Sequence, residues 1–261
     1  MDQPVKISII TPSLNQKIYI ERTIHSVLDQ QDGFSVEFII MDGGSTDGTA
    51  EIVQKYQGKL TWVSHPDKGQ SDALNQGVAM AKGEIIGWLN SDDLFLPGAL
   101  ERVSRFFEEN PSCNWVFGKC RIIDDQDREI RKWMTLYKNL YLKRFSYNAL
   151  LMENFISQPA VFFRKSAFET AGPLELDLPY AMDYDLWIRL AKKFKPGYIG
   201  EYLACFRVHQ DAKSKLYSKK QFQEQYAIHK KHDKRKIVLF LHRVSMIRTI
   251  VGYWIIDKMN G

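Results

Sequence analysis

Cysteine is scarce in this sequence, and its placement argues against two common ways of stabilising a fold. Among 261 residues only Cys113, Cys120 and Cys205 occur. Because they form no CxxC pair and no ligand-like spacing with histidine, we expect unpaired thiols in a reducing compartment rather than disulfides or a structural zinc site. The start of the sequence also lacks a basic stretch followed by a long apolar run, so neither a signal peptide nor an N-terminal anchor is predicted. A cytoplasmic location is the expectation.

Internal repeats and low-complexity segments are also missing, which argues against fibrous and disordered classes of protein. Hydrophobic residues make up 44% of the chain and aromatic residues 13%. At this length, such a composition can bury a substantial core. The sequence therefore predicts a globular protein of one large domain or one and a half.

Net positive charge is confined to the end of the sequence. Residues 213–261 contain 12 Lys and Arg and 3 Asp and Glu, a formal charge of +9. Since the whole chain has a formal charge of +5, the first 212 residues have a formal charge of −4. Such a tail could bind nucleic acid, anionic lipid or a phosphorylated partner. It lacks the interleaved aromatic and glycine residues of single-strand binders between residues 213 and 236, so no nucleic acid partner is expected.

The last apolar stretch, residues 237–256, is interrupted by His242, Arg243 and Arg248. Charged residues at this density weigh against a membrane-spanning helix. Two alternatives stay open, which are an amphipathic helix at a membrane interface and a helix docked on the protein's own core.

Hydrophobic periodicity in the first 110 residues alternates between the strand pattern and the helix pattern. Runs rich in β-branched residues predict strands, and each is followed by a polar loop and apolar residues at helical spacing. The expected strands are 5–11, 36–42, 60–65 and 83–90, and the expected helices are 20–28, 50–56, 71–81 and 97–110. This alternation predicts an α/β fold with a mostly parallel sheet and helices on both faces.

The pattern is less regular from residue 114 onward. Residues 114–123 and 128–134 resemble paired strands around the polar turn DDQD, and residues 136–152 are predicted to be helical. Beyond them the sequence predicts a strand and a short helix in 158–168, a helix in 182–194 and a strand in 197–209.

Carboxylates stand where two of the predicted strands end. Asp42 closes the second strand, and Asp92 and Asp93 follow the fourth. Since ligands of an open parallel sheet bind beyond the carboxyl ends of the strands, these side chains are expected to converge. Aspartate is also common in turns and helix caps, so each one alone is weak evidence. Together with Ser91, they suit a hard divalent cation whose remaining ligands are water and phosphate oxygens.

Four motifs in order resemble those of the family 2 glycosyltransferases of GT-A fold. They are ISIITPSLNQ, IIMDGGSTDGT, KGQSDALNQGVAMAKGEIIGWLNSDD and YAMDYDLWIRL, and the resemblance covers about residues 5–210. It implies a Rossmann-like GT-A domain in residues 1–212, with a nucleotide-sugar-binding half (1–110) and an acceptor half (111–212), followed by a helical tail (213–261). It also implies an inverting enzyme that moves a hexosyl-type sugar from a nucleotide diphosphate to an acceptor hydroxyl, using Mn²⁺ or Mg²⁺.

The resemblance assigns donor-binding roles to residues of the first half. Asp42 falls where a carboxylate recognises the base, and a carboxylate can accept the imide N–H of uracil or thymine, so UDP or dTDP is the expected carrier. Lys68 is expected to supply positive charge to phosphate. The other residues at donor-contacting positions are Thr11, Pro12, Asn15, Gly69, Gln70, Asn75, Asn90 and Ser91.

The resemblance also implies metal ligands. Asn90-Ser91-Asp92 occupies the place of the family's DxD motif, with Asp92 the first choice as metal ligand and Asp93 the competing one. Asn90 departs from the motif, so a contact to ribose or metal there loses its charge. His209, in FRVHQD, resembles the histidine that reaches metal or diphosphate late in the chain, although a lone histidine after a strand is often only a packing residue.

Asp183 falls at the last position of the family's ED motif, which is the general base that deprotonates the acceptor hydroxyl. Met182 stands in place of the motif's glutamate, so no acid is present at that position. An aspartate at a helix start can also simply cap the helix amides. Asp185, two residues further on, is the alternative base.

Three other functions share part of this pattern. A sugar-phosphate nucleotidyltransferase would carry a glycine-rich basic loop after the first strand, and TPSLNQKIY has no glycine. A non-catalytic nucleotide-sugar-binding relative would lack the base or the metal ligand, and a nucleic-acid adaptor would depend on the tail alone. We therefore expect a glycosyltransferase of bacterial surface polysaccharide synthesis (O-antigen, capsule or exopolysaccharide). It would act on a glycan or a polyprenyl-diphosphate-linked acceptor at the inner face of the plasma membrane, with the basic tail against lipid.

Overall fold

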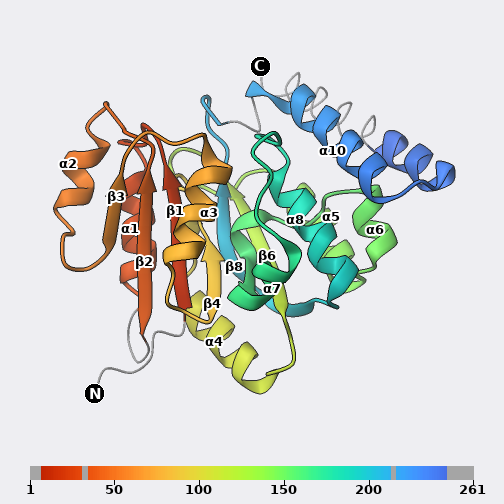
Figure 1. Cartoon of the computed structure of the whole chain (residues 1–261), viewed down its shortest axis with the longest axis horizontal. Helices are drawn as coiled ribbons and strands as arrows, with labels where there is room; N and C mark the ends of the chain where they lie inside the picture. The colour runs from red at the N-terminus through yellow and green to blue at the C-terminus, as the bar shows by residue number, and fades with distance from the viewer. Residues whose placement is uncertain (1–6, 31–34, 213–215, 246–261) are drawn as a thin grey trace.

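The computed structural model describes residues 7–30, 35–212 and 216–245 of the chain. These residues form an eight-stranded sheet in the order β3-β2-β1-β4-β7-β6-β8-β5 (Figure 1). The strands are β1 (Ile7–Ser13), β2 (Val36–Asp42), β3 (Thr61–Ser64), β4 (Ile85–Trp88), β5 (Leu94–Phe95), β6 (Trp115–Ile123), β7 (Val161–Arg164) and β8 (Gly197–Arg207).

Strand directions bring several loops to one edge of the sheet. β1 is parallel to β2 and β4, and β2 is parallel to β3. β7 runs antiparallel to both β4 and β6, while β8 is parallel to β6. The carboxyl ends of β1, β2, β4, β6 and β8 therefore all lie at the same edge. The predicted mostly parallel sheet is confirmed, with β7 and the short β5, which pairs antiparallel with β8, as the exceptions.

Helices cover both faces of the sheet, and each face has its own buried core. Side chains alternate along a strand, so Ile9 of β1 packs in one core and Ile10 in the other. The core around Ile9 includes residues of α1 (Ile20–Leu28), α2 (Thr49–Gln54) and α4 (Ala99–Glu109). The core around Ile10 includes residues of α3 (Gln70–Met80), α5 (Lys132–Lys143), α6 (Tyr147–Met152), α7 (Lys165–Ala171), α8 (Met182–Lys193) and α10 (Ser218–His232).

Two predictions for the middle of the chain are wrong in part. The pairing around DDQD is limited to an antiparallel bridge between Ile123 and Glu129 and a hydrogen bond from the Ile130 amide to the Ile122 carbonyl, and α5 already begins at Lys132. The predicted helix 136–152 is divided into α5 and α6, and Ser146 caps α6 by accepting a hydrogen bond from the amide of its third residue. The segment REIRKWM is short and has no strict alternation, and its apolar Ile130 and Trp133 stand three positions apart, which is helical rather than strand spacing.

The basic tail is helical where the structure describes it, and α10 lies along α8 (Figure 1). His232 Nε2 lies 2.8 Å from Asp185 Oδ1 of α8. Residues 236–245 are also helical, with Val238 and His242 buried against the domain core. Residues 246–256 of the predicted apolar helix lie outside the described residues. Within the described part of the chain, no helix is long and apolar enough to cross a membrane.

Candidate active site

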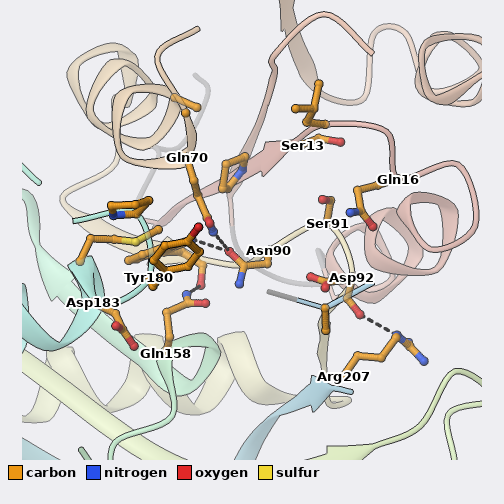
Figure 2. Close-up of a pocket in the computed structure, with 18 of the residues that line it drawn as sticks. Ser13, Gln16, Gln70, Asn90, Ser91, Asp92, Gln158, Tyr180, Asp183 and Arg207 are labelled. Carbon is orange, nitrogen blue, oxygen red and sulfur yellow. Dashed lines mark hydrogen bonds between the residues drawn. The ribbon is translucent and has the colours of Figure 1, made fainter. Parts of the chain in front are cut away.

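A cavity of about 480 Å³ opens at the sheet edge where β1, β4 and β8 end (Figure 2). The loop after β1, the start of α3, the turn after β4, the segment leading into α8 and the end of β8 all contribute to its walls. Among the predicted site residues, the lining includes Pro12, Asn15, Gly69, Gln70, Asn90, Ser91, Asp92, Asp183 and His209. The predicted residues that do not line the cavity are Thr11, Asp42, Lys68, Asn75 and Asp93.

Asp42 holds the loop after β2. Its carboxylate accepts hydrogen bonds from the Ser45 amide at 3.1 Å, from the Ser45 hydroxyl and from the Ser64 hydroxyl at 2.6 Å. The Ser45 hydroxyl in turn accepts from the Asn15 amide at 2.8 Å, and Asn15 Oδ1 accepts from the Thr46 amide at 2.9 Å. Asp42, itself 3% exposed, therefore ties the loop after β2 to the loop that carries Asn15.

Three other predicted residues, Asn75, Thr11 and Lys68, also lie outside the cavity lining. The Asn75 side chain donates to the Leu174 carbonyl at 3.0 Å and accepts from the Leu174 amide at 2.9 Å, which ties α3 to the segment before α8. Thr11 is fully buried within β1, and its hydroxyl has no hydrogen-bond partner among the residues described. Lys68 precedes α3, and its amide donates to Asp72 at 3.1 Å.

Asn90 is fixed at the centre of the cavity wall by its neighbours. Its Oδ1 atom accepts hydrogen bonds from Gln70 Nε2 at 2.7 Å and from the indole of Trp88 at 2.8 Å. Its amide nitrogen faces Asp93 Oδ2 at 3.4 Å. The Asn90 side chain thus accepts hydrogen bonds through its oxygen and offers its nitrogen as a donor to a carboxylate. An ionised aspartate at this position could accept the first two but could not donate to Asp93.

Asp92 and Asp93 are adjacent in sequence but have different surroundings. Asp92 lines the cavity (Figure 2), whereas Asp93 is fully buried and accepts a hydrogen bond from the Arg207 amide at 2.8 Å. Burial raises the pKa of Asp93 well above its usual range, and the neighbouring charge of Asp92 raises it further. The geometry therefore gives Asp92 access to a ligand and gives Asp93 a role in joining the turn after β4 to β8.

Asp92 and His209 form a small polar cluster that could hold a divalent cation. His209 Nε2 lies 3.1 Å from Asp92 Oδ2, and its ring packs against Tyr19 with 4.6 Å between centroids. No group of three or more His, Cys, Asp or Glu residues is gathered in metal-binding geometry within the described ranges. One carboxylate and one imidazole fit a cation such as Mn²⁺ only if water or a phosphorylated ligand completes the shell.

Asp183 lies in the first turn of α8 and points into the cavity from the side opposite Asp92 (Figure 2). Burial raises the pKa of Asp183 from 3.8 to about 6, although a hydrogen bond from the Tyr184 amide at 2.7 Å and the nearby charge of Lys138 act in the other direction. Lys138 Nζ contacts Ser157 Oγ at 3.3 Å. A carboxylate with a pKa near 6 is well placed to accept a proton at neutral pH.

Asp185 has a different environment from Asp183. It is fully buried and accepts hydrogen bonds from Arg189 Nε at 2.7 Å and from His232 Nε2 at 2.8 Å. Burial alone would raise the pKa of Asp185, but these two partners hold it below its usual value. Asp185 does not line the cavity, so it serves to join α8 and α10, and Met182 lines the wall beside Asp183.

Sequence reasoning missed residues whose position depends on tertiary contacts. Gln158 lines the cavity and donates to the Trp88 carbonyl at 2.5 Å. Arg207 donates to the Asp92 carbonyl at 2.6 Å, and its place at the end of β8, two residues before His209, was the one available signal. Other lining residues that were not predicted include Gln16, Tyr180 and Gln221.

Helix α10 also fixes the entry to α8. Glu224 Oε2 accepts hydrogen bonds from the amides of Tyr180 and Ala181, both at 2.9 Å. These residues immediately precede the turn that carries Asp183. The tail is therefore part of the structure that positions the cavity wall.

Comparison with known proteins identifies relatives of this chain. The model of the family described as Glycosyl transferase family 2 matches residues 8–172. The putative teichuronic acid biosynthesis glycosyltransferase TuaG of Bacillus subtilis is 31% identical over 209 residues, which cover 77% of this chain and 79% of TuaG. A PGL/p-HBAD biosynthesis glycosyltransferase of Mycobacterium bovis is 30% identical over 187 residues, covering 70% of this chain and 68% of that protein. An uncharacterised Mycobacterium tuberculosis protein is 30% identical over 197 residues, and there the match spans 70% of this chain but 61% of the relative's length.

Solved structures share the fold at low sequence identity. Staphylococcus aureus TarS 1-349 in complex with UDP-GlcNAc has a TM-score of 0.69 and 18% identity, covering 86% of this chain and 65% of that one. The mannosyltransferase PcManGT of Pyrobaculum calidifontis, in complex with GDP-Man and Mn²⁺, has a TM-score of 0.66 and 18% identity, covering 92% and 70%. These similarities confirm the expected GT-A fold.

Proposed function

Because the chain belongs to glycosyl transferase family 2, we propose that it is an inverting, metal-dependent glycosyltransferase whose general base is Asp183. The observation that supports this proposal is that two carboxylates of one cavity have different surroundings. Asp183 has a pKa raised to about 6 and faces Asp92 across the cavity, while Asp92 pairs with His209. One side of the cavity can therefore accept a proton while the other holds a cation.

In the proposed reaction, Asp183 accepts the proton of the acceptor hydroxyl as that oxygen attacks the anomeric carbon of the donor sugar. The bond from the anomeric carbon to the phosphate oxygen breaks, and the diphosphate leaves with the electron pair from the opposite face, which inverts the configuration. Asp92 and His209 would hold a Mn²⁺ or Mg²⁺ ion, which supplies positive charge near the leaving diphosphate. The Asn90 amide, held by Gln70 and Trp88, adds a fixed polar group beside the same ligand.

The proposed donor carries UDP or dTDP. Its base would lie beside the cavity, over the loop after β2, where Asp42 would accept the imide N–H although it does not line the cavity itself. An ionised carboxylate can accept about four hydrogen bonds. Three acceptor positions of Asp42 are used by Ser45 and Ser64, which leaves one. TarS was solved with UDP-GlcNAc and PcManGT with GDP-Man, so proteins of this fold bind different bases.

The proposed acceptor is a hydroxyl of a glycan or of a polyprenyl-diphosphate-linked glycan used to build a bacterial surface polysaccharide. The name of TuaG refers to teichuronic acid biosynthesis and the mycobacterial relative's name to PGL/p-HBAD biosynthesis, which supports this class. A lipid-linked acceptor would locate the enzyme at the inner face of the plasma membrane, where the basic tail would meet anionic lipid.

A turnover assay across a panel of UDP-, dTDP- and GDP-sugars tests the function directly. We expect nucleoside diphosphate release from one donor class in the presence of Mn²⁺. Asp183→Asn should lower turnover by ~10²–10⁴-fold and leave donor affinity, measured by calorimetry, unchanged. Asp177→Asn, an exposed carboxylate in the same segment, is the matched control. Normal turnover of the Asp183 variant would remove Asp183 as the base, and donor binding without turnover in the unmodified protein would favour the non-catalytic alternative.

A further inference from the structure

Helix α5 presents large apolar side chains to solvent. Trp133 is 51% exposed, Leu136 64% and Leu140 68%. Residues spaced by three, four and seven positions share one face of a helix, so the three side chains form a single strip on the outer face of α5. In the following text, we call Trp133, Leu136 and Leu140 the α5 strip. Isolated exposed leucines are ordinary on protein surfaces, but a tryptophan and two leucines in line on one helix are not.

Charge within the α5 segment itself has one sign. Residues 131–144 contain five basic residues and no acidic residue. Lys138 turns inward, where it contacts Ser157, so the remaining basic residues stand in pairs at the two ends of the strip: Arg131, Lys132, Lys143 and Arg144. An apolar strip with Trp and Leu, bounded at both ends by Lys and Arg, is the composition of helices that lie in the interface of an anionic bilayer.

A second helix adjoins α5 with the same character. Residues 236–245 expose Ile237, Phe240, Leu241 and Val244, and lysines at 234 and 236 are also exposed. Tyr137 of α5 and Ser245 donate hydrogen bonds to the same oxygen of Glu153, at 2.7 and 2.9 Å, so the two helices meet there. The apolar and basic surface is therefore larger than α5 alone.

We propose that α5 is a membrane-docking helix whose strip inserts into the interfacial region of an anionic lipid bilayer, with its terminal Lys and Arg residues against the lipid headgroups. The charge pattern favours lipid over a protein partner, because a bilayer offers hydrocarbon flanked by negative charge along the whole helix. Docking in this way would also place the cavity near the membrane surface. The inner face of α5 carries Lys138, whose partner Ser157 precedes the cavity residue Gln158.

Sedimentation of the full chain with vesicles tests this proposal without donor or acceptor, so its outcome is independent of the transferase proposal. Vesicles of phosphatidylcholine with a quarter phosphatidylglycerol are compared with vesicles of pure phosphatidylcholine. We expect binding to the anionic vesicles and little binding to the neutral ones. Leu136→Gln together with Leu140→Gln should weaken binding by about 100-fold, about tenfold for each leucine. Lys132→Gln together with Lys143→Gln should weaken it by roughly 25-fold, about fivefold for each lysine.

Matched controls separate the α5 strip from general effects of surface changes. Met80→Gln with Leu176→Gln removes two exposed apolar side chains elsewhere, and Lys192→Gln with Lys193→Gln removes two exposed charges. Both controls should bind vesicles as the unmodified protein does, and circular dichroism should show that every variant is folded. Binding that survives the double leucine change, or that falls equally in the controls, overturns the proposal. The proposal is also overturned if the unmodified protein binds no vesicles and is a dimer that the double leucine change converts to a monomer. The α5 strip would then be a contact between two copies of the chain.

Discussion

The raised pKa of Asp183 should affect both the stability of the fold and the pH dependence of activity. Folding raises that pKa from 3.8 to about 6, chiefly by burial. Between about pH 4 and pH 6 the folded protein keeps a proton that the unfolded chain has lost, so the stability of the fold decreases as the pH rises through this window. Below about pH 4 the cost is absent, and above about pH 6 it is complete.

The size of the effect follows from the shift. Each pKa unit corresponds to about 1.4 kcal/mol, so a shift of about two units costs about 3 kcal/mol at most. Because Asp183 lines the open cavity, where solvent screens part of this cost, we expect about 2 kcal/mol. Asp183→Asn removes the titration and should raise the free energy of unfolding by that amount at pH 8, with no change at pH 4. For a chain of this size, the melting temperature at pH 8 should rise by roughly 4–8 °C.

Two assays check this reasoning on the same protein. Thermal unfolding by circular dichroism at pH 4 and pH 8 measures the stability difference, and the pH profile of kcat/KM measures the base. In the unmodified protein kcat/KM should fall about tenfold per pH unit below pH 6. Lys138→Met removes a positive charge near Asp183, so the acid limb of the kcat/KM profile should move to higher pH. Lys193 is exposed, and Lys193→Met should leave this acid limb unchanged. A stability gain of Asp183→Asn that is equal at both pH values would refute the account, as would an acid limb near pH 4.

Three further predictions concern the rest of the cavity. Asp92→Ala should weaken donor binding in Mn²⁺ by about tenfold or more while changing binding in EDTA little, which calorimetry can measure; equal affinities in Mn²⁺ would remove Asp92 as a cation ligand. Glu224→Gln keeps one oxygen that can accept from the two amides before α8 but loses the charge, so it should cost about 1 kcal/mol in urea unfolding and lower kcat more than donor affinity. Asn90→Asp introduces a carboxylate facing Asp93, and should lower the melting temperature at pH 8 more than at pH 5; a variant as stable as the unmodified protein at both values contradicts the contact.

Sequence patterns identified the parts of this fold that depend on local periodicity. The alternation of β-branched runs with helical spacing was sufficient for the first four parallel strands and their helices. The same reasoning failed at the start of α5, where the segment REIRKWM is predicted as a strand although Ile130 and Trp133 have helical spacing. An exposed apolar strip also misleads pattern analysis, because an apolar helix face is normally assumed to point into the core.

The candidate site shows the same limit at the level of single residues. Asp92 and Asp93 could not be distinguished from sequence, since both follow β4 and the backbone between them turns. What separates them is the amide of Arg207, more than a hundred residues away, which takes the Asp93 carboxylate out of the cavity. Likewise, the sequence leaves Asp185 as an alternative base, but in the fold its carboxylate is hydrogen-bonded to Arg189 and His232.

The asparagine at position 90 has a physical reason in these surroundings. Its Oδ1 atom already accepts hydrogen bonds from Gln70 and Trp88, and its amide nitrogen faces the fully buried Asp93. A carboxylate at position 90 would lie close to the fully buried Asp93, and ionising both carboxylates there would be unfavourable. Since Asp93 is needed to hold β8 through the Arg207 amide, an uncharged residue at position 90 relieves that conflict. The negative charge facing the cavity from this turn then rests on Asp92, which makes Asp92 the residue whose removal should affect a bound cation most.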